Sequence, residues 1–194
     1  MHYLRLGLAL CSVSVSFCFA APVPTAQNLT AEQQQKIEDS LSQGDEAAAH
    51  QELVRLAEEG NAQAQSFLGA WYFTQGQQDT RSYREAFKWF SRAAKQGYGE
   101  AQYRLGEMYF YDYGIGKQSD RQAAKWWLAS AEGCDVTPSL DCVKARNNLG
   151  MLYAHGIGVK KNQDDAKFWL TKVAEQHHDP LLRAIALENL LRIM

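Results

Sequence analysis

The chain is poor in the residues that define several special classes of protein. It has only 4 Pro and 14 Gly in 194 residues, which excludes collagen-like and Pro/Gly-rich disordered chains. Four Cys are too few for a small disulfide-dense scaffold. Neither sign of charge dominates, because 20 Lys and Arg stand against 22 Asp and Glu, and a nucleic-acid binder would show a concentrated basic excess. With 46% hydrophobic residues, the chain has enough apolar surface to form one ordinary domain.

The only long apolar run lies at the start of the sequence. It extends from residue 6 to 19, follows the basic Arg5, and ends in a small-x-Ala site at Ala20. This order is typical of a secretory signal peptide, and we expect cleavage after Ala20, with Ala21 as the next candidate. An uncleaved anchor is the alternative, although the run is short for a membrane span of about 20 apolar residues. The residues before Cys11 and Cys18 are bulky, which disfavours a lipoprotein site.

Removal of this peptide changes the cysteine count and the charge. Cys11 and Cys18 leave with it, so the mature chain keeps Cys134 and Cys142 and a net charge of -3, from 19 basic and 22 acidic residues. Two cysteines in an exported chain are most simply a disulfide, which would stabilise the fold by about 2–3 kcal/mol. A metal or redox role is the alternative, but no Cys-x2-Cys motif is present. The predicted location is the periplasm, or the medium if the protein is secreted.

Three related segments make up most of the mature chain. In each, the motif Ala-x3-Leu-Gly-x2-Tyr is followed by a second motif, Ala-x2-Trp. The Leu-Gly pairs lie 37 and then 44 residues apart, and the seven extra residues surround the cysteine pair. The first motif begins at Ala64, Ala101 and Ala145, and the second at Ala86, Ala123 and Ala166.

The spacing within each motif predicts one helix, so each segment contains two. Residues three or four apart share one face of a helix. Ser82-x-x-Glu85 and Asn162-x-x-Asp165 resemble capping boxes at the start of second helices. A Gly inside a helix costs about 1 kcal/mol relative to Ala. Its recurrence in the three first helices predicts a close approach by the backbone of a neighbouring helix, at Gly69, Gly106 and Gly150.

These motifs, together with the Gly-Ile-Gly-Val turn at 156–159, resemble Sel1-like repeats, a subclass of the tetratricopeptide-type arrays. The resemblance covers about residues 60 to 177, and the first repeat departs from it by having Gln75-Gly76-Gln77 at the turn. It implies an all-α fold, a short right-handed α-solenoid of antiparallel helix pairs with capping helices. An unrelated helical bundle with the same spacing is the alternative. The resemblance also links the cysteines to a Cys-x7-Cys bridge between adjacent helices in cysteine-rich relatives, although here the pair lies inside an insertion.

The sequences on both sides of the repeats are interpreted as capping helices. A solenoid needs atypical terminal repeats, because one face of each terminal repeat is exposed to water. A helix start at Thr30-x-x-Gln33 and an Asp179-Pro180 step define the two caps. The predicted organisation is a signal peptide (1–20), a flexible segment (21–29), a capping helix pair (30–59), repeat 1 (60–97), repeat 2 (98–133), an insertion with the cysteine pair (134–143), repeat 3 (144–177) and a capping helix (178–194).

No group of residues predicts catalysis. His177-His178-Asp179 offers metal-binding side chains, but consecutive residues in a turn rarely point at one ion and no third ligand has a suitable spacing. The sequence has no nucleophile elbow, phosphate-binding loop or zinc-protease helix. We therefore predict no catalytic residues, no metal and no cofactor.

The aromatic residues outnumber what one face of each first helix can bury. Positions +1, -3 and +4 from the repeated Gly lie opposite the Leu/Tyr face, and stacking would align them as a stripe on the concave surface. Such a stripe is typical of a protein-binding groove. The alternative is that loops or terminal helices cover Phe73 and Phe110. The predicted partner-binding residues are Ser66, Ala70, Phe73, Tyr103, Glu107, Phe110, Asn147 and Met151.

The leading hypothesis is a non-catalytic module of the bacterial cell envelope that binds a protein or peptide and neither nucleic acid nor, after cleavage, the membrane. The resemblance implies a role as adaptor, regulator or antagonist of a secreted toxin. It also implies an enzymatic alternative, because some cysteine-rich relatives are associated with weak β-lactam binding or hydrolysis. The chain lacks a Ser-x-x-Lys motif for that reaction. A purely structural envelope scaffold is the third hypothesis.

Overall fold

The structure, a computed structural model, describes residues 27–114, 116, 118–135, 139–175 and 180–194. The predicted signal peptide, residues 21–26 of the predicted flexible segment, part of the insertion and the His177-His178-Asp179 run lie outside the described residues. Within them, the secondary structure is entirely helical.

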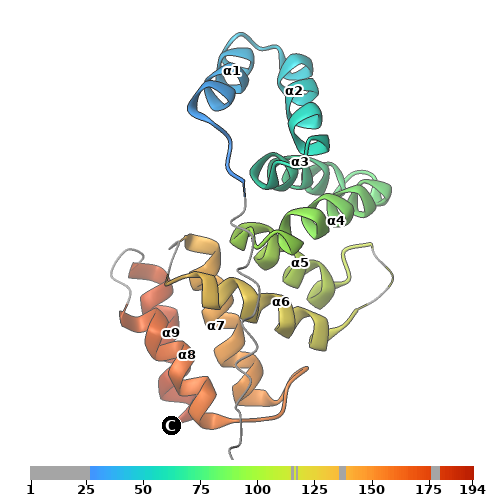
Figure 1. The fold of residues 1–194 in the computed structure, drawn as a ribbon. Helices are drawn as coiled ribbons and strands as arrows, with labels where there is room; N and C mark the ends of the chain where they lie inside the picture. Colours follow the sequence, from blue (N-terminus) through green and yellow to red (C-terminus); the bar gives the residue numbers. More distant parts are fainter. Residues whose placement is uncertain (1–26, 115, 117, 136–138, 176–179) are drawn as a thin grey trace, which may run out of the picture.

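The described helices follow one another along a curved stack (Figure 1). The two at the N-terminal end form a pair, and the remainder alternate between the first and second helix of each repeat, followed by a final helix. Their bounds are α1 Ala31–Ser42, α2 Glu46–Glu58, α3 Ala62–Gln75, α4 Thr80–Lys95, α5 Gly99–Tyr111, α6 Asp120–Gly133, α7 Leu140–His155, α8 Gln163–Glu175 and α9 Pro180–Ile193.

The stack has an inner and an outer layer. Each helix packs against the next along the chain, and the first helices α3, α5 and α7 also contact one another in order, with α9 against α7. The second helices α4, α6 and α8 make no such contacts with one another in the part of the chain described. Because, among the described residues, the first helices contact one another and the second helices do not, the stack curves towards the first helices, which line its inner side. The predicted all-α solenoid of antiparallel helix pairs is confirmed.

Polar side chains fix where the helices begin. Thr30 accepts a hydrogen bond from the amide of Gln33 and forms a capping box at the predicted helix start, which is that of α1. Asn162 Oδ1 accepts from the amide of Asp165 at 3.3 Å before α8, as its pattern predicted. The prediction for α4 is wrong, because this helix begins at Thr80 with Asp79 as its cap, which places Ser82 inside the first turn.

Each repeated Gly receives a large side chain from the second helix of its own repeat. A Cβ on Gly106 would lie 2.5 Å from Cδ1 of Trp127, a distance that real Cβ atoms do not tolerate. The equivalent contacts pair Gly69 with Phe90 and Gly150 with Leu170. The predicted close approach is therefore real, and at all three glycines the nearest atoms belong to a side chain, although at Gly150 the backbone carbonyl oxygen of Ala166 also lies 3.3 Å from the Cβ position. The residue that follows each repeated Trp makes this contact, a role that the sequence pattern alone did not predict.

A disulfide joins the end of α6 to the first turn of α7. Cys134 and Cys142 are bonded, with their Cα atoms 5.4 Å apart, as predicted. Beside the bridge, the buried guanidinium of Arg146 donates to the carbonyl of Ala131 at 3.2 Å and to Oδ1 of Asp135 at 2.6 Å. Hydrogen bonds from Lys172, at 2.9 Å, and from Arg146 lower the pKa of Asp135. The insertion thus fixes α6 to both α7 and α8.

Candidate protein-binding surface

The predicted partner-binding residues all lie on the first helices, but they differ in burial. Ser66 is fully enclosed, and its hydroxyl has no hydrogen-bond partner among the described residues. Ser66 therefore packs beneath the surface and cannot contact a partner directly. Tyr103 is also buried. The half-buried residues are Ala70, Phe73, Glu107, Phe110, Asn147 and Met151.

Tyr103 organises the polar groups between α5 and α7. Its hydroxyl donates to Oε1 of Glu107 at 2.9 Å. The guanidinium of Arg104 and the ammonium of Lys144 lie 5.6 and 5.8 Å from its ring centroid, within the range of a cation–π interaction. Burial, reinforced by the charge of Glu107, raises the pKa of Tyr103 far above its usual value, so the phenol stays neutral.

Two ion pairs lie beside this tyrosine on the same side of the stack. Arg104 pairs with Glu107 at 3.0 Å, and Lys144 pairs with Asp141 at 3.4 Å. Glu100 is half-buried near them, and its burial, with the charge of Asp141, raises its pKa. Both signs of charge are thus present at the junction of α5 and α7.

The two phenylalanines of the predicted stripe are partly covered. The ring centroid of Phe73 lies 5.2 Å from that of Tyr83 on α4 and 4.9 Å from that of Tyr113 in the loop after α5. Phe110 contacts Trp127 on α6, with ring centroids 5.2 Å apart. A second helix therefore covers part of each ring, and a loop residue also covers part of Phe73. The alternative, in which loops or terminal helices cover both rings, holds only for the loop contact at Phe73.

The Phe, Trp and Tyr side chains of the first helices that are more than a third exposed are ones that the predicted stripe omitted: Phe67, Trp71 and Tyr111. Trp71 on α3 is 40% exposed and packs against His50 of α2, with ring centroids 4.3 Å apart. Phe67 on α3 is 39% exposed and Tyr111 on α5 is 58% exposed. They lie at -2 and +5 from the repeated Gly, which at 100° per residue is about 140° to 160° from the side that meets the second helix. Positions -3 and +4 lie only about 40° to 60° from that side. Using the Gly to mark the contact with the second helix would have found them.

We call the resulting set of residues the inner arc. It takes positions -2, +1 and +5 from each Gly and keeps three residues of the predicted stripe, one in each repeat. The inner arc consists of Phe67, Ala70, Thr74, Arg104, Glu107, Tyr111, Asn148, Met151 and His155.

Neither a metal site nor a membrane-spanning helix is present among the described residues. No cluster of three His, Cys, Asp or Glu side chains in the described ranges has the arrangement of a metal site. Among the described helices, none is both long enough and apolar enough to span a bilayer.

The stacked helix pairs and their inner arc define the class: this is a helical-repeat protein of the α-solenoid type. The Sel1 repeat family profile matches residues 62–98, 99–133 and 143–178, and the chain belongs to the Sel1 repeat family. Such repeats generally serve as non-catalytic modules for protein–protein interaction. No curated protein matches the chain.

The solved structures that are similar to it include two bacterial proteins. The first is c5321, a protective antigen of uropathogenic Escherichia coli strains with an SLR fold, at 28% identity and a TM-score of 0.64. The match covers 76% of this chain but only 29% of that antigen. The second is a Sel1 repeat protein from Oxalobacter formigenes, at 28% identity and a TM-score of 0.57, covering 73% of this chain and 96% of that protein.

Proposed function

We propose that the inner arc binds a segment of a protein partner in the bacterial cell envelope, as an adaptor, a regulator or an antagonist of a secreted toxin. The observation that carries this proposal is the exposure of Phe67 and Tyr111 on the inner side of a repeat fold. Exposed apolar side chains that lie together and are rimmed by polar residues are typical of protein-binding surfaces.

The mechanism is capture without turnover. Aromatic side chains contribute most of the binding energy at protein interfaces, so Tyr111 and Phe67 act as anchors. The ion pairs of Arg104 with Glu107 and of Lys144 with Asp141 add orientation more than affinity, since partly exposed pairs are worth about 0–1 kcal/mol. A partner segment that carries an apolar side chain beside both an acidic and a basic side chain fits this surface.

Two observations support a location outside the cytoplasm. Disulfides persist in oxidising compartments, and Cys134 and Cys142 are bonded. The first twenty residues also have the order of a secretory signal. We expect the mature protein in the periplasm or secreted, after cleavage at Ala20.

Site-specific photo-crosslinking tests the surface. A photoreactive residue in place of Tyr111 should crosslink one partner in intact cells. The control replaces Phe168, an exposed aromatic residue on α8, and should give no crosslink. The partner is then identified, purified and titrated against variants by calorimetry.

In that titration, Phe67→Ala combined with Tyr111→Ala should weaken binding by at least about tenfold, because interface aromatic anchors are each worth more than about 1 kcal/mol. Phe168→Ala is the matched control and should bind like the unaltered protein. Equal affinities for the two variants would refute the inner arc as the site. Robust penicillin hydrolysis by the purified protein would instead favour the enzymatic alternative, and several simultaneous partners would favour the scaffold.

A further inference from the structure

The chain before α1 is fixed to the first turn of α3 (Figure 1). The carbonyl of Gln27 accepts hydrogen bonds from the amides of Ala62 and Gln63, at 3.1 and 3.2 Å. The amide of Leu29 donates to Oε1 of Gln63 at 2.9 Å, and the Leu29 side chain is buried. The residues that precede position 27 therefore start at the N-terminal end of α3.

Gln63 lies in the same sector of α3 as the inner arc. It stands at -6 from Gly69, which at 100° per residue is about 120° from the side that meets α4. Phe67 of the inner arc lies at about 160°. The residues at -6 in the other repeats are Glu100 on α5 and Lys144 on α7, and all three are half-buried. We call Gln63, Glu100 and Lys144 the first-turn row, which extends the inner arc by one turn towards the N-terminal ends of the first helices.

Glu100 is the member of the first-turn row whose side chain lacks a partner. In the part of the chain that the structure describes, its carboxylate has neither a hydrogen bond nor an ion pair, whereas Lys144 pairs with Asp141 at 3.4 Å. Burial and the charge of Asp141 raise the pKa of Glu100, and the charges of Arg104 and Lys144 oppose this rise only in part. The junction of α5 and α7 therefore favours an additional positive charge beside Glu100.

The segment between the predicted cleavage site and Gln27 has the length and the charge to lie on this row. Its sequence is Ala-Pro-Val-Pro-Thr-Ala, from residue 21 to 26. Prolines at alternate positions favour the extended polyproline II conformation, in which six residues span about 19 Å. Packed helices lie about 8–10 Å apart, so this length reaches from α3 across α5 towards α7. After cleavage at Ala20, the α-ammonium of Ala21 is the only charge in the segment, and it has the sign that Glu100 needs.

We propose that residues 21–26 form an N-terminal arm that lies along the first-turn row and pairs the α-ammonium of Ala21 with the carboxylate of Glu100. The arm then covers the end of the inner arc beside Phe67, where it competes with the partner. This regulation rests on the proposed function, because the arm covers part of the surface that the partner binds. It also depends on export, since cleavage at Ala20 creates the ammonium. The arm is short and its ion pair is partly exposed, so it lowers the affinity of the partner without blocking the surface.

Photo-crosslinking within the purified mature protein locates the arm without a partner. Mass spectrometry should first identify Ala21 as the N-terminal residue, and any other N-terminus would overturn the ion pair. A photoreactive phenylalanine in place of Val23 should crosslink to residues 96–104, the tryptic peptide that contains Glu100. The control places it at Leu41, an exposed residue on α1, and should give no such crosslink. In a mixture of isotopically light and heavy protein, the absence of this crosslink, or a crosslink only between copies, would overturn the proposal.

Removal of either charge tests the ion pair. Glu100→Gln, or selective acetylation of the N-terminal amine, should lower the yield of this crosslink about twofold or more. Glu58→Gln, which changes an exposed carboxylate on α2, is the matched control and should leave the yield unchanged. Circular dichroism should show unchanged helix content for Glu100→Gln, since no described side chain pairs with this carboxylate. Equal yields from Glu100→Gln and the unaltered protein would refute the pairing.

The affinity of the partner tests the regulation. With the partner captured at Tyr111, deletion of residues 21–26 should raise the affinity by about two- to fivefold, because a weak competitor is removed. Glu100→Gln should give part of this gain. Unchanged affinity after the deletion would overturn the regulation. The crosslink within the chain reports the position of the arm whether or not a partner is found, so it separates failure of this proposal from failure of the proposed function.

Discussion

At the scale of single residues, the repeat depends on a side chain fitting against a glycine. The indole of Trp127 lies against Gly106, and its Nε1 donates to the carbonyl of Tyr103 at 3.2 Å. The ring is almost fully buried, so it cannot move aside without losing that hydrogen bond. The helix accepts the cost of a central Gly because this contact fixes the distance between α5 and α6.

Gly106→Ala should therefore lower the free energy of unfolding by about 1–3 kcal/mol, the usual range for overpacking a core. Urea denaturation measures this change. Gly99→Ala is the matched control in the same helix, because a Cβ there meets no atom within 4 Å. It should be neutral or stabilising by up to about 1 kcal/mol, since Ala favours the helix. If both substitutions increased the free energy of unfolding, Trp127 would leave room for a Cβ at position 106, and the prediction would be wrong.

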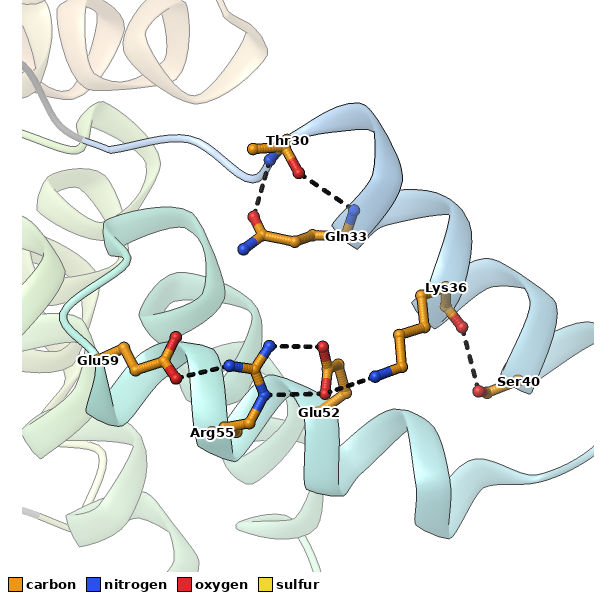
Figure 2. Close-up of polar contacts among 7 residues, drawn as sticks. All are labelled: Thr30, Gln33, Lys36, Ser40, Glu52, Arg55 and Glu59. Atoms are coloured by element: carbon orange, nitrogen blue, oxygen red, sulfur yellow. Dashed lines mark hydrogen bonds and ion pairs between the residues drawn. The ribbon is translucent and has the colours of Figure 1, made fainter.

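At the scale of elements, the N-terminal pair of helices is joined by a polar network (Figure 2). Glu52 on α2 accepts two hydrogen bonds from Arg55, at 2.7 and 3.1 Å, and pairs with Lys36 of α1 at 3.2 Å. Hydrogen bonding by Arg55, followed by that of Lys36, lowers the pKa of Glu52 from 4.5 to about 2, against the opposing effect of burial. Glu52 is thus an ionic link between α1 and α2.

The lowered pKa predicts a specific acid sensitivity. Because the pKa of Glu52 is lower in the folded than in the unfolded chain, its contribution to stability is complete above pH 4.5 and is lost as the pH falls towards 2. Glu52→Gln should therefore destabilise the protein at neutral pH, and this difference should shrink over that interval. Thermal unfolding at a series of pH values measures it.

The matched control for this experiment is Glu58→Gln, which changes an exposed carboxylate on the same helix. Its pH profile should run parallel to that of the unaltered protein. If the pH profile of Glu52→Gln also ran parallel to that of the unaltered protein, protonation of Glu52 would not be coupled to folding.

At the scale of the whole molecule, stability is distributed along the stack and does not come from one central core. Among the described residues, three separate clusters of buried side chains follow one another along the stack, each shared by neighbouring helices. In the described residues, α1 contacts only α2, whereas α5 contacts α3, α4, α6 and α7. Structures of this kind open from the ends, because each unit is held only by its neighbours.

Amide hydrogen exchange should reflect this arrangement. We expect α1 to exchange fastest among the described helices and α5 and α7 to exchange slowest, since protection increases with the number of packed neighbours. Mass spectrometry of peptides after timed exchange measures the order. Equal protection of α1 and α5 would indicate one cooperative unit and contradict the expectation.

Much of the fold could be predicted because the repeat is local in sequence. The offsets within Ala-x3-Leu-Gly-x2-Tyr define one helical face, and three copies define the stacking. The candidate binding surface was harder to predict. Of the predicted partner-binding residues, Glu107 and Met151 are half-buried and also belong to the inner arc, whereas Tyr103 and Ser66 are buried and Tyr111 was omitted. A helical wheel gives relative angles, and it does not show which sector faces the next helix.

The sequence by itself determined the helices, their pairing, the Sel1 repeat register and the two cysteines of the bridge, because each depends on spacings within about 40 residues. Only the tertiary structure decided which side chains fill the glycine sites and which aromatic residues remain exposed. Those outcomes depend on how far the second helix of each repeat is rotated against the first. That rotation follows from the packing of Phe90, Trp127 and Leu170 against their glycines, and these contacts join residues on different helices.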